Sequence, residues 1–494
     1  MAVQPPFTIT ITSKEHPDLY TFRQVTMIQP RQFDHDAVFT NPSLSEVYNK
    51  LVSVASEFAV LGEIETTRTL VSLLLRDTTL EWQRQQLKIF EPFFAAAGLW
   101  PAEIPEEDRT TKTASKTAAK HSLDDEEDGR QKDDEKKLQE QMKQARDGGS
   151  SVVVDALCTA VRLASKHIED LQEIKSDSRV QEALELISKN LHRKRIIKSL
   201  VAHHELCGIL SAGELAQKVP ADKAKLEAAG KEVIATFSER FTKGRKKHDI
   251  ESKPMKEVLL ELERYTKTNG TSHWDAMEEP VPETLFVLPP ATDEQVSSLE
   301  KKLGITLPDD YKDFLKISNG FGGTWNGYHL DNPLYGVDDV SWARESFEVP
   351  YVELHNSISG IIELRINDIS KPEWPSSGRT VEIGSLDVLS TLLIPPKNTK
   401  VILDAYQEAL DDPRNTDDAK KQTLKSIEAR YGSLEEMKKL DWAVIEQHDS
   451  ETLPSGTFRQ CLEERLRRAK SGPNLNGTEK ELGGIAYSCK ADDS

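Results

Sequence analysis

A stretch that offers little to bury interrupts the chain between residues 101 and 150. It holds 14 acidic and 10 basic side chains but few larger apolar ones, which are Ile104, Leu123, Leu138 and Met142. Because so few apolar groups cannot offset the entropy lost when a backbone is ordered, this composition predicts a disordered charged linker. The chain must therefore build its cores on either side of this segment.

Regular apolar patterns occupy the segments around this linker. Phe7–Thr12 alternates with the period of a strand, whereas apolar residues recur every three or four positions within Leu44–Phe58 and Val154–Ile168. The predicted units are an N-terminal helical domain with one leading strand (1–100), the linker (101–150), a helical middle domain (151–270), a C-terminal domain ending in helices (285–470) and a flexible tail (471–494). The expected fold class is α+β in a multidomain chain.

The charge and the cysteine content exclude several classes of protein. The formal net charge of −19 disfavours binding to nucleic acid or to anionic membranes. No run approaches the roughly 18 apolar residues of a membrane span, and the N-terminus lacks the pattern of a secretory signal. The four cysteines form no CxxC pair. These features favour a reduced intracellular protein, in the cytoplasm with a nuclear pool as the alternative.

The most specific motif runs from Glu294 to Gly323. Thr292 and Gln295 form the capping box of a helix that Gly304 ends, and Pro308 suits the first turn of a second helix. Strand-like runs follow this pair of helices, among them Thr380–Ile383, Leu392–Ile394 and Val401–Leu403. Two helices followed by strands predict an α+β module with a mostly antiparallel sheet.

This motif, in which Leu-Pro-Asp-Asp-Tyr-x-x-Phe-Leu precedes Asn-Gly, resembles the SUKH superfamily and more narrowly the Smi/Knr cell-wall-regulator family. The resemblance covers about residues 285–445. Its motif residues here are Leu307, Pro308, Tyr311, Phe314, Leu315, Asn319 and Gly320. The resemblance implies a protein-binding module: fungal members are adaptors that link cell-wall synthesis to stress signalling, and bacterial relatives are immunity proteins. The partners it implies are proteins such as kinases or cell-wall synthesis regulators.

The sequence carries no catalytic or cofactor motif. Gly320–Gly327 has tryptophan where a dinucleotide fingerprint needs glycine, and it lacks the lysine of a phosphate loop. His203 and His204 are adjacent, so on a helix they point about 100° apart and do not chelate a metal together. We therefore expect no cofactor, no metal and no enzymatic activity.

Aromatic and acidic side chains gather after the Asn-Gly turn. Aromatic anchors with a polar rim are typical of protein-binding patches. The predicted protein-binding residues are Phe321, Trp325, Tyr328, Tyr335, Asp338, Asp339 and Trp342. The alternative is that Trp325 and Trp342 fill the core of the sheet.

Two other functions compete with a regulatory adaptor. The first is a nuclear, transcription-linked helical protein, which the basic clusters Arg193–Arg195 and Lys243–Lys247 would suit. The second is an enzyme with an unrecognised site in the middle domain. Ser122 precedes an acidic run and is a candidate phosphorylation site. Residues 271–494 contain 24 basic and 40 acidic side chains, so they carry −16 of the net charge, which favours the C-terminal half as the recognition element.

Overall fold

The computed structural model describes residues 33–77, 84, 86–109, 127–146, 152–166, 170–191, 194–219, 223–344, 348–349, 352–355, 374–448 and 451–470. The leading strand expected at Phe7–Thr12, Ser122 and the tail expected from residue 471 lie outside this part of the chain. None of the described helices is both long enough and apolar enough to span a membrane.

Short caps and turns define the first helices. Ser43 caps α2 by accepting a hydrogen bond from the Glu46 backbone N–H. After α2 the chain turns at Gly62, whose φ of +78° and close approach to the Gly213 backbone leave no room for a side chain. The elements are α1 (His35–Thr40), α2 (Leu44–Val60), α3 (Ile64–Asp77), η1 (Lys88–Phe90), α5 (Glu91–Ala97) and η2 (Glu106–Asp108).

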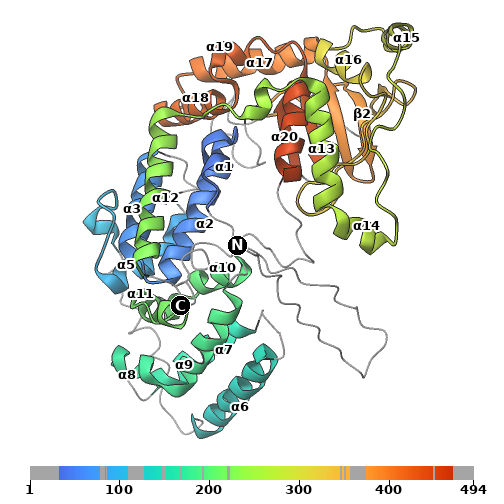
Figure 1. Cartoon of the computed structure of the whole chain (residues 1–494). Helices are drawn as coiled ribbons and strands as arrows, with labels where there is room; N and C mark the ends of the chain where they lie inside the picture. Colours follow the sequence, from blue (N-terminus) through green and yellow to red (C-terminus); the bar gives the residue numbers. More distant parts are fainter. Residues whose placement is uncertain are drawn as a thin grey trace, which may run out of the picture.

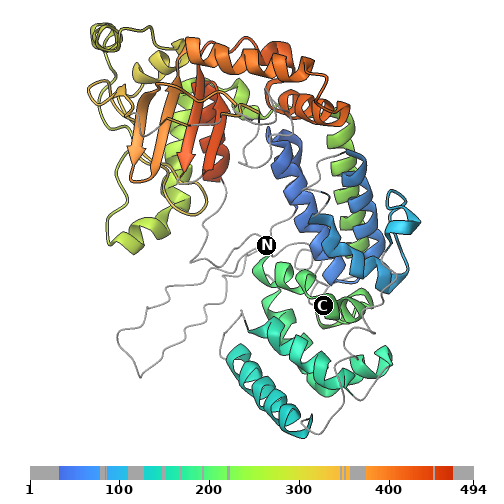
Figure 2. The ribbon, with the colours of Figure 1, turned by 180° about the vertical axis from the view of Figure 1, so that it is seen from behind.

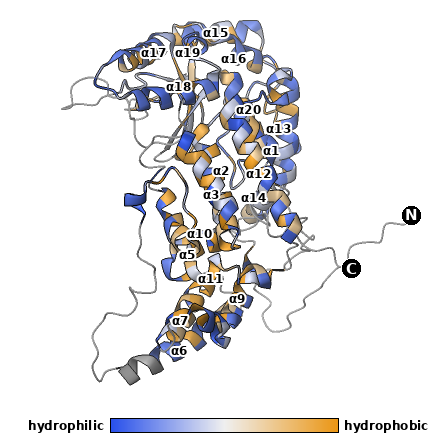
Figure 3. Cartoon of the chain, turned by 90° about the vertical axis from the view of Figure 1, so that its left-hand side faces the viewer, coloured by the Kyte–Doolittle hydropathy of each residue, from blue (hydrophilic) through white to orange (hydrophobic). Residues whose placement is uncertain are grey.

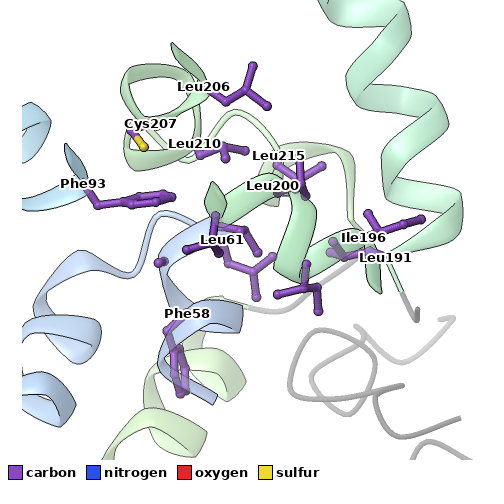
Figure 4. Packing of buried hydrophobic residues seen from close by; sticks show 14 of the residues in the cluster. Phe58, Leu61, Phe93, Leu191, Ile196, Leu200, Leu206, Cys207, Leu210 and Leu215 are labelled. Carbon is purple, nitrogen blue, oxygen red and sulfur yellow. The ribbon is translucent and has the colours of Figure 1, made fainter. Parts of the chain in front are cut away.

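The middle helices pack on these first helices instead of forming a separate domain. One apolar core includes residues from Val38 to Phe237, and Figure 4 shows Leu61 of the first turn beside Leu200, Leu210 and Leu215. In Figure 1, α12 lies along α2 and α3. The elements are α6 (Glu127–Arg146), α7 (Val153–Ser165), α8 (Leu171–Ser176), α9 (Ser178–Asn190), α10 (Lys194–Ala202), η4 (His204–Leu206), α11 (Cys207–Ser211), η5 (Ala216–Lys218) and α12 (Lys223–Lys243). The predicted division between residues 1–100 and 151–270 is therefore wrong for the described residues.

The second half of the predicted linker is helical. In α6, Leu138, Met142 and Ala145 are buried in the helical core, against α7. Their spacing of four and three places them on one face, which is enough to order a helix when a partner already exists. The expectation of a disordered linker is thus wrong for residues 127–146.

The boundary at residue 270 also differs from the prediction. Val258, Leu259 and Leu262 of α13 are buried in the C-terminal core, and α13 lies beside α20 (Figure 1). The elements that precede the sheet are η6 (Asp249–Ser252), α13 (Met255–Asn269), α14 (Thr271–Met277), α15 (Asp293–Leu303) and α16 (Asp309–Leu315). In Figure 3, α13 and α15 are largely hydrophilic on the side that faces the viewer.

Five antiparallel strands form the sheet in the order β1-β2-β3-β4-β5. They are β1 (Ser341–Trp342), β2 (Val381–Leu386), β3 (Leu389–Ile394), β4 (Ala443–His448) and β5 (Glu451–Gly456). Three helices follow β3, namely α17 (Pro396–Asp411), α18 (Asp417–Tyr431) and α19 (Leu434–Met437). The last helix, α20 (Phe458–Lys470), follows β5. This architecture confirms the α+β, multidomain fold class and the antiparallel sheet.

Helices cover both faces of the sheet. On β3, Leu393 belongs to the core shared with α13, α15, α16 and α20, whereas Leu392 and Ile394 belong to the core under α17–α19. This alternation with period two explains why the strand reads as a continuous apolar run. The strand expected at Val401–Leu403 is instead part of α17, which starts at two prolines, Pro395 as N-cap and Pro396 as first residue.

Candidate protein-binding surface

An exposed aromatic residue occupies the tip of a tight turn between residues 325 and 330. Trp325 and Leu330 form a bridge, and the Asn326 side-chain oxygen accepts hydrogen bonds from the backbone N–H groups of Tyr328, at 2.9 Å, and His329, at 3.0 Å. Gly327 takes a φ of +102° at the corner. Tyr328 is left 68% exposed.

Buried charges fix the base of this turn. The Asp331 carboxylate, which is fully buried, accepts a hydrogen bond from the Asn326 amide at 2.7 Å and pairs with the Arg468 guanidinium at 3.0 Å. Arg468 also lies 2.7 Å from the Glu446 carboxylate of β4. Although burial alone lowers the pKa of Arg468, Glu446 and Asp331 raise that pKa well above its usual value. The turn is therefore held to α20 and to the sheet.

A second arginine completes this network. Arg465 and Glu446 are both fully buried and pair at 2.7 Å. The other Arg465 donors reach the Asn332 carbonyl at 2.9 Å and the Thr391 hydroxyl at 2.7 Å. Arg465 and the half-buried Arg468 balance the buried carboxylates of Glu446 and Asp331, so this network of four charges is formally neutral.

The turn lies near the tip of the β2–β3 hairpin. The Tyr335 N–H donates to the Ile383 carbonyl at 2.8 Å, and the Pro333 carbonyl lies so close to Gly384 that a Cβ there would be 2.3 Å away. The segment before Tyr335 thus runs beside β2 toward the hairpin tip. There Leu386 and Val388 are each 51% exposed. Figure 2 shows the arrow of β2 pointing to the end of the sheet that α14 approaches.

We call Tyr328, Leu386 and Val388 the hairpin-end surface. It is apolar, exposed and carried by a rigid base, which are properties of binding anchors. The α14 helix, which approaches this end of the sheet (Figure 2), has the 60% exposed Met277 as its last residue. Of these residues, sequence analysis had selected Tyr328.

Two of the predicted binding residues belong to the core. Phe321 and Trp325 have no exposed surface, and both pack with the helices on one face of the sheet. The Trp325 backbone N–H donates to the Thr266 hydroxyl of α13 at 3.1 Å. The prediction that Phe321 and Trp325 form part of a binding surface is therefore wrong, because no partner can touch them in this fold.

The remaining predicted residues gather at the β1 edge. Asp338 and Asp339 are exposed, and Tyr335 and Trp342 are half-buried. Burial, together with Glu382 and Asp339, raises the pKa of the Tyr335 hydroxyl, which donates to Glu382 at 3.3 Å. The Trp342 indole N–H donates to the Leu303 carbonyl at 3.1 Å. The structure thus places Trp342 at the edge strand β1, apart from the turn that carries Tyr328.

The family-motif residues build the frame of the domain. Tyr311 and Phe314 pack against Phe458 of α20, and the Asn319 side chain accepts a hydrogen bond from the Val337 N–H at 2.8 Å. Gly320 takes a φ of +99°. The other motif residues are buried Leu307 and Leu315, and Pro308, the N-cap of α16.

Comparison with known proteins identifies this part of the chain. Residues 290–387 match the model of the SMI1 / KNR4 family (SUKH-1). The chain carries an SMI1/KNR4-family domain. The match covers 98 of 494 residues, from just before α15 to the tip of the β2–β3 hairpin, so that β3, β4, β5 and the helices α17–α20 lie beyond it. No curated protein and no solved structure gives a match.

Sequence reasoning missed the hairpin tip and the charge network of Asp331, Glu446, Arg465 and Arg468. Leu386 and Val388 flank Asp387, which has a φ of +54°, and two apolar side chains around a turn residue are a signal of an exposed patch. Arg465 lies on the apolar face of α20, between Leu462 and Leu466, and an arginine there indicates a buried partner.

Proposed function

We propose that the protein is a non-enzymatic regulatory adaptor that binds partner proteins through the hairpin-end surface of its SMI1/KNR4-family domain. The observation that carries the proposal is the exposed Tyr328 on a turn whose base is fixed by Asp331 and Arg468. A rigid aromatic anchor loses little conformational entropy on binding, so its contact area contributes fully to affinity. SUKH domains are in general protein-interaction modules.

The pathway we propose follows from the family resemblance. An adaptor of this kind links cell-wall synthesis to stress signalling, and its partners are kinases or regulators of wall synthesis. The excess of acidic residues over residues 271–494 suits partners with a basic surface, because complementary charge speeds association and rejects acidic competitors.

A matched pair of substitutions tests the proposal. Val388 and Val401 are both valines with 51% exposure, but Val388 lies on the hairpin end and Val401 on α17. We expect Val388→Asp to remove most partner recovery in quantitative affinity capture from cells, and Val401→Asp to leave it unchanged. Tyr328→Ala should reproduce the loss. Equal recovery with all three variants would refute the hairpin-end surface as the binding site.

The described part of the second basic cluster argues for an adaptor over a nuclear nucleic-acid binder. Lys243 and Lys246 pair with Glu239, and Arg245 pairs with Glu251. These contacts neutralise charge that a phosphate backbone would need. In the first cluster Arg195 is exposed, while Arg193 lies outside the described residues.

A further inference from the structure

Three side chains with metal-binding atoms meet where α7 approaches the η4 turn. Cys158 lies on α7, His203 precedes η4 as its N-cap, and Glu205 lies in η4. The Cys158 sulfur, one ring nitrogen of His203 and one carboxylate oxygen of Glu205 all lie within 4.8 Å of one another. This group differs from the His203–His204 pair that sequence analysis excluded, because it includes Cys158, which lies 45 residues before His203.

The separations suit a tetrahedral ion. Bond lengths of about 2.0–2.3 Å to nitrogen, oxygen and sulfur place two ligands of a tetrahedral zinc about 3.3–3.6 Å apart. His203 Nδ1 and Glu205 Oε1 are 3.4 Å apart, which is that spacing. The Cys158 sulfur lies within 4.8 Å of both of these atoms.

The backbone holds two of the ligands in place. The Leu206 N–H donates to the His203 carbonyl at 3.0 Å, and the His203 N–H donates to the Leu200 carbonyl at 3.3 Å. The buried Leu206 and Leu210 anchor the turn in the helical core (Figure 4). The side chains of His203 and Glu205 remain 35% and 51% exposed, so an ion can enter from solvent and keep a water in a fourth position.

We propose that Cys158, His203 and Glu205 bind one zinc-class divalent transition-metal ion. A thiolate, an imidazole and a carboxylate are the donors that such ions prefer. The thiol loses its proton to solvent when the ion binds, and no electron is transferred. The ion ties α7 to the turn between α10 and α11 and so strengthens the junction between two groups of helices. The site lies far along the chain from the SMI1/KNR4-family domain and does not depend on its proposed function.

Cobalt(II) is a suitable probe, because a cobalt–thiolate bond absorbs in the near ultraviolet and tetrahedral cobalt has intense visible bands. We expect the full chain, freed of metal by a chelator and kept reduced, to bind one equivalent of Co²⁺ with both signatures, and Zn²⁺ to displace it. Cys158→Ser should abolish the thiolate band. His203→Gln alters a part-exposed side chain and so keeps the fold, and it should weaken Co²⁺ binding at least tenfold.

Matched controls come from the same turn. Cys207 lies beside Phe93 inside the core (Figure 4), and His204 is exposed next to His203. Cys207→Ser and His204→Gln should therefore keep the stoichiometry and both spectra, with circular dichroism confirming the fold of each variant. Absence of a thiolate band in the wild-type chain, its persistence in Cys158→Ser, or unchanged Co²⁺ affinity in His203→Gln would overturn the site.

Discussion

The two halves of the molecule solve the problem of buried polarity in opposite ways. In the helical half, the buried Arg240 guanidinium donates to two backbone carbonyls, those of Val38 and Asn41, and burial lowers its pKa to about 10. In the sheet half, the fully buried Arg465 and the half-buried Arg468 face carboxylates, and the pKa of each is raised. Arg240 is thus satisfied by backbone carbonyls, whereas Arg465 and Arg468 belong to a charged network.

This difference reflects what each half has to specify. Helices with an apolar face associate by burying apolar surface. A small shift of one helix changes this buried area little, so apolar packing alone defines position loosely. A loop that must sit at a fixed place against a sheet has few apolar contacts to define it. The Asp331–Arg468 pair supplies that definition for the turn carrying Tyr328. The buried charges of the sheet half thus position a surface, and the aliphatic core of the helical half supplies stability.

The largest effect should come from breaking the charged network. Arg465→Met leaves Glu446 with one cationic partner and removes donors from Thr391 and Asn332. Loss of one member of a buried pair costs about 3–5 kcal/mol. Urea unfolding followed by tryptophan fluorescence should show this loss of unfolding free energy.

The exposed pair of Arg414 and Asp412 is the matched control. It has a similar distance of 2.6 Å, but the Arg414 side chain is 45% exposed. Arg414→Met should cost less than about 1 kcal/mol, because solvent screens such a pair. Similar costs for the two arginine variants would show that burial of the network does not matter.

An aliphatic truncation probes the other half. Leu200 is fully buried among the helices around α10 (Figure 4), so Leu200→Ala should cost about 3 kcal/mol through lost transfer energy and the cavity left behind. Leu99, which is 38% exposed, is the control and should cost well below that when changed to alanine. Thermal unfolding by circular dichroism measures both. A negligible effect of Leu200→Ala would contradict an aliphatic core as the source of stability.

Local chemistry could be predicted from the sequence, and long-range pairing could not. The capping box of Thr292 and Gln295 and the left-handed stop at Gly304 are present as expected, because each depends on residues three or four positions apart. The packing of the helix at 127–146 was missed, because its three apolar residues suffice only once α7 is present, and the composition of the segment does not show α7. Val401–Leu403 shows the limit of β-propensity, since Pro395 and Pro396 start a helix there.

The candidate site divides along the same line. Tyr328 was predicted because aromatic anchors with a polar rim are typical of protein-binding patches, but the same reasoning selected Trp325, which is fully buried. Only the pairing of the turn with α13 and the sheet separates these two cases. Likewise, Cys158 gave no signal, because its proximity to His203 arises from the packing of α7 on the η4 turn.

The pH dependence of stability tests a third buried polar group, the pair of His355 and Tyr406 on the other face of the sheet. His355 Nδ1 lies 2.5 Å from the Tyr406 hydroxyl, and burial, reinforced by Arg430, lowers the pKa of His355 from 6.5 to about 3. As pH falls from 6.5 toward 3, the unfolded chain takes up a proton that the folded chain rejects. Stability should therefore fall by up to about 1.4 kcal/mol per pH unit, or about 2 kcal/mol by pH 5.

His355→Gln should flatten this acid slope, because glutamine keeps an acceptor for the Tyr406 hydroxyl and does not titrate. Urea unfolding at a series of pH values gives the slope for both proteins. The same slope in wild type and His355→Gln would assign acid sensitivity to other groups.

The smallest effect should appear where the two halves meet. The Tyr48 hydroxyl of α2 donates to Asp77 at 2.7 Å and accepts from Gln422 of α18 at 3.0 Å, while Lys425 lies 2.6 Å from the Asp77 carboxylate. Lys425 is 29% exposed, so Lys425→Met should cost about 1 kcal/mol, the value of a partly screened pair. Lys400, paired with Asp404 on the exposed face of α17, is the matched control and should cost less.

The informative readout is the separation of two unfolding transitions. Because Lys425→Met weakens the link between α18 and the first helices without touching either core, it should lower the cooperativity between the halves more than it lowers the stability of either half. Hydrogen exchange measured separately for peptides of α2 and of β3 reports both quantities. If the two sets of peptides still exchange with one common free energy in the variant, the halves form a single cooperative unit. Apolar contacts between the halves, such as that of Ala429 of α18 in the helical core, would then contribute more than the polar contacts of Lys425.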